Sequence, residues 1–95
     1  MIDSVYRFRN EAFILREVEN ELVLVPLVNN IVDMTDVITL NEVATAILQA
    51  IDGKTSNNEI IEIIFQKYEI DKDILTKDIF DFIESAVEKR IIELV

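Results

Sequence analysis

The sequence predicts an α+β fold, with strands in the first part of the chain and helices in the second. Residues 5–40 are rich in Val, Ile, Leu and Phe, contain the single proline and show no sustained helical period, which is typical of strands. Residues 41–95 carry helix caps and apolar residues spaced three and four apart, as helices do. Strands followed by helices favour α+β over a parallel α/β sheet. With 95 residues, we expect one domain over residues 1–95.

The first two predicted strands form a hairpin. Residues 13–18 are the first strand, residues 19–21 are a polar turn, and residues 22–25 return as the second strand. Pro26 cannot donate to a ladder, so it marks a strand end or a sheet edge. An earlier apolar stretch, residues 5–8, either lengthens the first strand or stands alone.

The third predicted strand is short and lies after a loop. Residues 29–36 mix turn formers with apolar residues and predict the loop, and residues 37–40 predict the strand. Three short strands leave two sheet edges, which proteins usually protect with charge or proline. Residues 37–39 contain neither, and an added peptide strand is the physical use of such an edge.

Two helices follow the third strand. Asn41 is a suitable N-cap for a helix over 42–51, with Thr39 and Glu42 as a rival capping pair. Gly53 suits the left-handed position after that helix. The capping box from Ser56 to Glu59 predicts a second helix over 57–68.

A third helix is predicted over residues 72–90, with Asp71 as its cap. Residues 91–95 are then a short closing strand or an extended tail. At 100° per residue, the helix has a first apolar stripe, which we interpret as its core face: Leu75, Ile79, Phe82 and Ala86. A second stripe lies about 100° further round: Thr76, Phe80, Ile83, Val87 and Ile91. The second stripe packs on the sheet or in a dimer, or it forms a groove wall that receives an apolar ligand side chain.

The composition argues against catalysis. The chain has no cysteine and no histidine, and it has a single glycine, which excludes thiol chemistry, the commonest general base and a glycine-rich phosphate loop. Paired acids such as Asp71 with Asp73, and Asp78 with Asp81, are interpreted as surface charge. Asp33 and Asp36 lack the ligand number of a calcium loop. We therefore expect no enzyme, no metal and no cofactor.

The charge distribution constrains the partners. The net charge is −10, and each half of the chain is acidic. Nucleic acid and anionic membranes are disfavoured, whereas a cationic peptide is attracted. No signal peptide or apolar run of about 20 residues is present, so a cytoplasmic protein is the default expectation.

The order and spacing of several short motifs over residues 13–92 resemble the PqqD-like family. The matching positions are residues 15–18, 38–42, Ile47, 52–55, 59–60, Tyr68, 78–79, 82–83 and 91–92. Leu48 stands where many members have Trp, and Arg90 stands where Gly commonly follows the third helix. An arginine there disfavours the left-handed cap and favours a longer helix.

The resemblance implies a winged-helix-like domain with a three-stranded antiparallel sheet followed by three helices. It also implies a recognition element, or peptide chaperone, for ribosomally made and post-translationally modified peptides. The precursor's leader segment would add as a strand beside the third strand and against the third helix, and it would be presented to a modifying enzyme such as a radical enzyme or a protease. On this chain, the implied peptide site is Asp36, Val37, Ile38, Thr39, Thr76, Phe80, Ile83 and Val87. An acidic rim of Asp36, Asp81 and Glu84 favours a leader that carries Lys or Arg.

Two other functions stay open. A small structural or dimerisation subunit without a peptide ligand would bury Phe80 and Val87 against a second copy. A winged-helix transcription factor shares the layout, but the net charge of −10 and the lack of a basic recognition helix argue against it. We expect a monomer or a weak homodimer.

Overall fold

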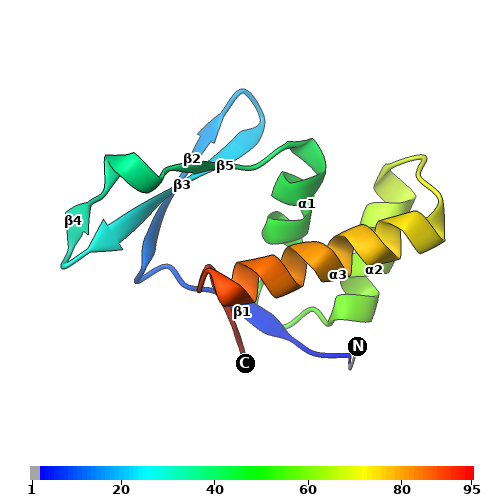
Figure 1. Ribbon diagram of the computed structural model, residues 1–95. Helices are drawn as coiled ribbons and strands as arrows, with labels where there is room; N and C mark the ends of the chain where they lie inside the picture. Colours follow the sequence, from blue (N-terminus) through cyan, green and yellow to red (C-terminus); the bar gives the residue numbers. More distant parts are fainter. Residues whose placement is uncertain (1–2) are drawn as a thin grey trace.

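The computed structural model describes residues 3–95 and has a strand-rich end and a helical end (Figure 1). The elements follow in the order β1 (Tyr6–Phe8), β2 (Phe13–Val18), β3 (Glu21–Val28), β4 (Ile31–Val32), the 3₁₀ helix η1 (Met34–Asp36), β5 (Ile38–Thr39), α1 (Glu42–Ala50), α2 (Asn57–Lys67), α3 (Lys72–Glu88) and β6 (Ile92–Leu94). The predicted α+β class is confirmed.

An antiparallel sheet is built around β3. β2 pairs with β3 through a turn at Glu19 and Asn20, whose φ angles are 52° and 70°. Two successive left-handed residues define the turn type that matches the twist of a hairpin. β5 pairs with the opposite edge of β3, with Val23 opposite Thr39. The three strands predicted from the sequence therefore belong to one antiparallel sheet, with β3 in the centre.

The predicted loop over residues 29–36 contains secondary structure, which corrects the sequence prediction. Asn29 and Asn30 form a second left-handed turn, with φ angles of 53° and 64°, and β4 then pairs with the end of β3 as a fourth strand. Asp33 caps η1 by accepting a hydrogen bond from the N–H of Thr35 at 3.0 Å. The two asparagines tolerate the left-handed region, which makes this tight hairpin possible.

The first strand stands alone and closes on the end of the chain. β1 pairs antiparallel with β6 in a separate two-stranded sheet, with Arg7 opposite Glu93. Arg7 and Arg9 both form ion pairs with Glu11 and Glu93. Residues 91–95 thus supply a closing strand rather than a free tail.

The helix caps follow the sequence signals. Asn41 accepts a hydrogen bond from the N–H of Ala44, Ser56 and Glu59 form the capping box, and Asp71 caps α3. Gly53 has a φ of +80°. The helices end one or two residues before the predicted positions, as frayed ends usually do.

α3 ends at Glu88, and the chain then turns through a left-handed residue, Arg90, where glycine is the usual choice. Arg90 has a φ of +59°. Its N–H donates to the carbonyl of Val87 at 3.0 Å, and the N–H of Ile91 donates to that of Ala86 at 2.8 Å. This pattern is the Schellman motif. The expectation that Arg90 lengthens the helix was wrong, because burial of Ile91 and Ile92 requires the chain to turn here.

The core lies between the three helices and the inner face of β3. Its fully buried side chains include Leu24, Ile47, Ile60, Leu75, Ile79 and Ile83. Thr45 of α1 joins the sheet to this core, because its hydroxyl accepts from the N–H of Leu22 at 3.0 Å and donates to the carbonyl of Leu40 at 3.3 Å. Within residues 3–95, no helix is both long and apolar enough to cross a membrane.

Candidate functional site

β5 is an edge strand with a free side. It pairs with β3 and, among residues 3–95, with no other strand. The N–H of Leu40 donates to the carbonyl of Leu22 at 2.8 Å, so Leu40 faces β3. Main-chain groups alternate sides along an antiparallel strand, and those of Thr39 therefore point away from β3. The next residue to point the same way is Val37, which has an extended backbone with φ −63° and ψ 133°.

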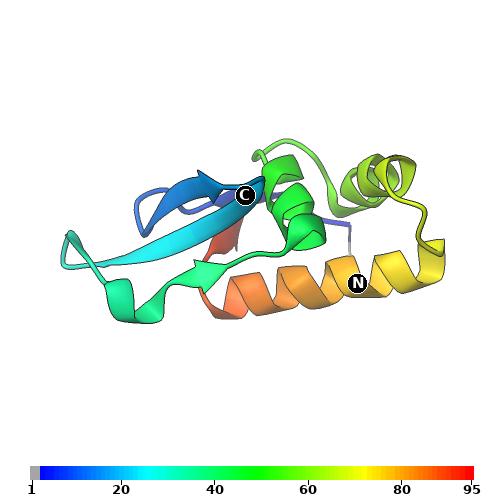
Figure 2. The ribbon, with the colours of Figure 1, turned by 90° about the horizontal axis from the view of Figure 1, so that it is seen from above.

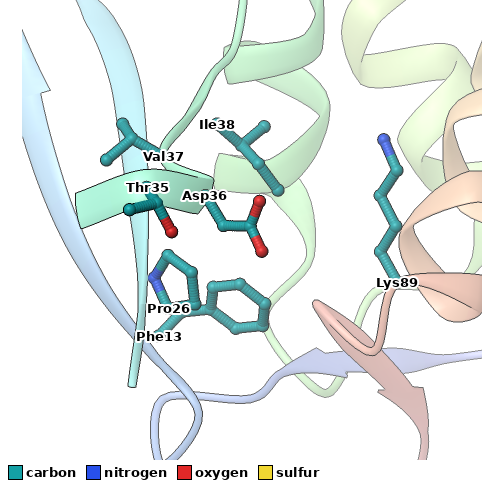
Figure 3. A pocket seen from close by; sticks show the side chains of 7 residues that line it. All are labelled: Phe13, Pro26, Thr35, Asp36, Val37, Ile38 and Lys89. Atoms are coloured by element: carbon teal, nitrogen blue, oxygen red, sulfur yellow. The ribbon is translucent and has the colours of Figure 1, made fainter. Parts of the chain in front are cut away.

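A hollow of about 490 Å³ opens where β5 begins. We call it the wing hollow, and it is lined by Phe13, Pro26, Thr35, Asp36, Val37, Ile38 and Lys89. Figure 3 shows Lys89, at the end of α3, standing across the opening from Asp36 and Ile38. The walls thus come from η1 and β5 on one side and from α3 on the other, with β2 and β3 contributing an aromatic ring and a proline.

Two further hollows continue along α3. The middle hollow, about 260 Å³, is lined by Ile38, Thr39, Leu40, Asn41, Ala44, Phe82, Ser85, Ala86, Lys89 and Ile91. The helix hollow, about 330 Å³, is lined by Asn41, Val43, Ala44, Ile47, Ile70, Asp78, Asp81 and Phe82. Ile38 and Lys89 are shared by the first two hollows, and Phe82 is shared by the last two. Together they make one groove, and Figure 2 shows β5 and the start of α1 running alongside α3.

The strand residues predicted from the sequence do line this groove. Asp36, Val37 and Ile38 lie in the wing hollow, and Ile38 and Thr39 lie in the middle hollow. The side chain of Val37 is 36% exposed, so the wing hollow offers an apolar side chain for contact with a ligand.

The helix residues predicted for the same site lie elsewhere. Ile83 is 1% exposed and belongs to the core. Thr76 donates to the carbonyl of Lys72 at 2.7 Å, on its own helix. Val87, 41% exposed, borders a separate hollow beside Arg9 and β6. Phe80 is half-buried, and it is about 160° round the helix from Phe82.

The face of α3 that does line the groove mixes polar and apolar residues. Phe82, Ser85 and Lys89 follow one another at three and four positions, and Asp78 lies four positions before Phe82. The sequence predicts Phe82 on the core face and Ile83 in the groove. In the structure Phe82 packs against the core and also lines the groove, whereas Ile83 is buried in the core. The residues of this face have helical spacing in the sequence. An analysis of apolar stripes does not identify them, because the face contains charged and polar residues as well as Phe82.

Charges are distributed unevenly along the groove. Among its described lining residues, Lys89 is the one base, whereas Asp36, Asp78 and Asp81 are acids. Asp81 forms an ion pair with Lys77 at 2.8 Å, and this hydrogen bond raises the pKa of Lys77. Glu84 lies on the opposite side of the helix from Phe82, about 200° away, so it does not belong to the acidic rim.

Two local hydrogen bonds hold the start of η1 in place. Asp33 accepts from both the hydroxyl and the N–H of Thr35, and these bonds lower the pKa of the Asp33 carboxyl. They fix η1, from which Thr35 and Asp36 enter the wing hollow. Among the described residues, no group of three or more acids is arranged to hold a metal ion.

These features define a small winged-helix-like α+β protein with a groove between an edge strand and a helix. A sequence profile described as "Coenzyme PQQ synthesis protein D (PqqD)" matches residues 21–92. The chain therefore belongs to the PqqD family, and the resemblance expected from the sequence is confirmed. A comparison with curated protein sequences finds no significant match.

One solved structure shares the fold. It is described as "TbiB1 in Complex with the TbiA(beta) Leader Peptide", and it is similar to this chain with a TM-score of 0.75 and 21% sequence identity. The match covers 92% of this chain and 94% of that one. At this identity the likeness confirms the fold, including the predicted winged-helix-like arrangement.

Proposed function

We propose that residues 1–95 are a single, non-catalytic module that binds the leader segment of a ribosomally made precursor peptide. The leader adds as a strand along the free edge of β5 and lies in the groove against α3. The observation that carries this proposal is the free edge of β5, which opens on a groove instead of on bulk solvent. Main-chain hydrogen bonds would supply affinity, and the hollows would supply side-chain selectivity.

The family and the shared fold support this proposal. The matching profile is named for a coenzyme synthesis protein, and the neighbouring structure holds a leader peptide. The bound leader is then presented to a peptide-modifying enzyme, such as a radical enzyme or a protease. The acids Asp36 and Asp78 favour a leader that carries Lys or Arg.

The test uses peptides selected from a random 12-residue display library on the immobilised protein. The best peptide is titrated into ¹⁵N-labelled protein, and amide shifts are followed by NMR. We expect the largest shifts at Thr39 and along the groove face of α3, with slowed hydrogen exchange at Thr39. Shifts that gather instead around Phe80 and Val87 would move the site to the far side of α3. Failure to select any peptide would contradict the proposed function.

An exposed apolar surface favours a second candidate function, a dimerisation subunit. Around the β3–β4 hairpin and η1, Val28 is 53% exposed, Ile31 70% and Met34 68%. Exposed apolar patches of this kind mark interaction sites. Sedimentation equilibrium of the chain and of an Ile31→Asp variant tests this candidate, which requires a dimer that the substitution dissociates.

A further inference from the structure

The groove carries charges of both signs in separate hollows, and this charge pattern goes beyond the proposed function on which it rests. Lys89 faces Asp36 across the wing hollow, but in the middle hollow Lys89 is the one charged side chain among the described lining residues. Lys89 borders both the wing hollow and the middle hollow. Asp78 borders the helix hollow at the other end. Within the part of the chain that the structure describes, Lys89 forms no ion pair. Asp78 forms none either, although its charge helps to raise the pKa of the adjacent Lys77, whose ion-pair partner is Asp81.

We infer that the groove selects a peptide with a carboxylate side chain beside Lys89 and a basic side chain beside Asp78. The chain has a net charge of −10, so a single base at the groove is locally distinctive. A ligand that is basic throughout would place a cation against Lys89, whereas a ligand of mixed charge satisfies both ends. Unpaired charges at a recognition surface fix register and partner choice more than they add affinity.

The helix sets the spacing of the two charges. Asp78 and Lys89 are eleven residues apart, which is about 16 Å along a helix. An extended peptide covers that distance in about five residues. Side chains of a strand alternate between two faces, so two residues that both enter the groove are an even number apart. The two charges of the peptide are therefore four or six positions apart.

An apolar residue fits between the two charges. The middle hollow is lined by Phe82 and Ala86, four positions apart on α3, and by the small side chain of Ala44 on α1. The inferred ligand class is thus an extended segment with one basic and one acidic residue, separated by four or six positions, and an apolar side chain between them.

The test repeats the library selection on the wild-type protein and on two charge-reversal variants, Lys89→Glu and Asp78→Lys. Wild-type selections should be enriched in peptides with the inferred charge pair. Lys89→Glu should replace the acidic residue with a basic one, and Asp78→Lys should remove the basic one. A wild-type peptide should bind each variant about three- to tenfold more weakly, and added salt should reduce this difference.

Matched controls place the same charge changes away from the groove. Lys67→Glu lies at the end of α2, and Glu84→Lys lies on the opposite side of α3 from Phe82. Neither should alter the selected pattern. Thermal denaturation should show that every variant is folded. If the wild-type protein selects peptides without the charge pair, or if the pair survives both reversals, the inference is wrong while the proposed function stands. If no peptides are selected, both fail.

Discussion

Phe82 is the aromatic side chain that two of the three hollows share. We predict that Phe82→Ala weakens binding of a selected peptide at least tenfold, because loss of an aromatic anchor in a groove costs about 2 kcal/mol or more. The melting temperature should fall moderately, since the ring also packs against the core. Isothermal titration calorimetry and thermal denaturation measure the two effects separately.

Phe80→Ala is the matched control, because Phe80 is half-buried on the far side of the same helix. It should lower the melting temperature and leave peptide binding unchanged. If Phe80→Ala weakens binding and Phe82→Ala does not, the peptide lies on the opposite face of α3.

The sequence alone predicts Phe82 on the core face and Phe80 in the groove, whereas the structure packs both rings against the core and lines the groove with Phe82. Both Phe82 and Ile83 continue the spacing of Leu75 and Ile79, since each is three or four positions further along. Periodicity therefore identifies two apolar stripes, but it does not determine which one the neighbouring elements cover. The tertiary structure decides this, because Phe82 lines two hollows together with Ala44 of α1, whereas Ile83 is buried in the core.

Arg90 is held in the left-handed region without glycine's freedom. For a residue with a Cβ, this conformation costs about 1–2 kcal/mol of free energy in the folded state. Glycine removes this cost, but it also increases the conformational entropy of the unfolded chain, which offsets part of the stabilisation. We predict that Arg90→Gly raises the free energy of unfolding by up to about 1 kcal/mol. Urea denaturation measures this change.

Arg90→Ala separates the backbone effect from the loss of the arginine side chain. Alanine keeps the Cβ that disfavours a positive φ, so this variant should not be stabilised. Equal stabilisation of both variants would show that the side chain, and not the φ of +59°, is the source of the effect.

Among the secondary-structure elements, β5 has the free edge to which a peptide strand would add, and proline substitutions in β5 test this role. The main chain of Thr39 points away from β3, so Thr39→Pro removes a donor that the fold does not use, and edge strands tolerate proline in that orientation. We predict that Thr39→Pro stays folded and binds a selected peptide much more weakly. Binding by calorimetry and the near-native amide spectrum are the two readouts.

Ile38→Pro is the comparison variant on the same strand, because the main chain of Ile38 faces β3 whereas that of Thr39 points away from it. Ile38 lies opposite Leu24 and faces β3, so this substitution removes a hydrogen bond of the sheet itself. It should lower the melting temperature clearly more than Thr39→Pro does. Normal peptide binding by a folded Thr39→Pro variant would exclude strand addition at this edge.

The elements differ in how well local sequence predicts them. The three helices were predicted within two residues because Asn41, Ser56 with Glu59, and Asp71 satisfy their own helix ends. β1 and β6 were left with alternatives, since Arg7 and Glu93 are far apart in the chain and no local signal pairs them. The hairpin to β4 had a local signal in Asn29 and Asn30, which is readable as a tight turn.

For the whole molecule, the fold resembles DNA-binding winged helices, but the acidic net charge argues against DNA binding. A recognition helix needs a basic surface against the phosphates. α3 instead carries five acids and two bases over Lys72–Glu88, and the chain as a whole has a net charge of −10. Lys72 and Lys77 are the two bases that α3 could offer to the phosphates.

We therefore predict no micromolar association with duplex DNA. Fluorescence anisotropy of a labelled 20-base-pair duplex at low salt is the stringent measurement, because electrostatic binding is strongest there. The anisotropy should stay flat as the protein is added, since an acidic surface repels the phosphate backbone at long range when screening is weak. A charge-reversed variant with Asp78→Lys, Asp81→Lys and Glu84→Lys serves as the positive comparison, because it gives α3 a basic face and should gain weak, salt-sensitive binding. A wild-type affinity in the micromolar range that falls steeply with added salt would contradict the charge argument and restore the transcription-factor function as a candidate.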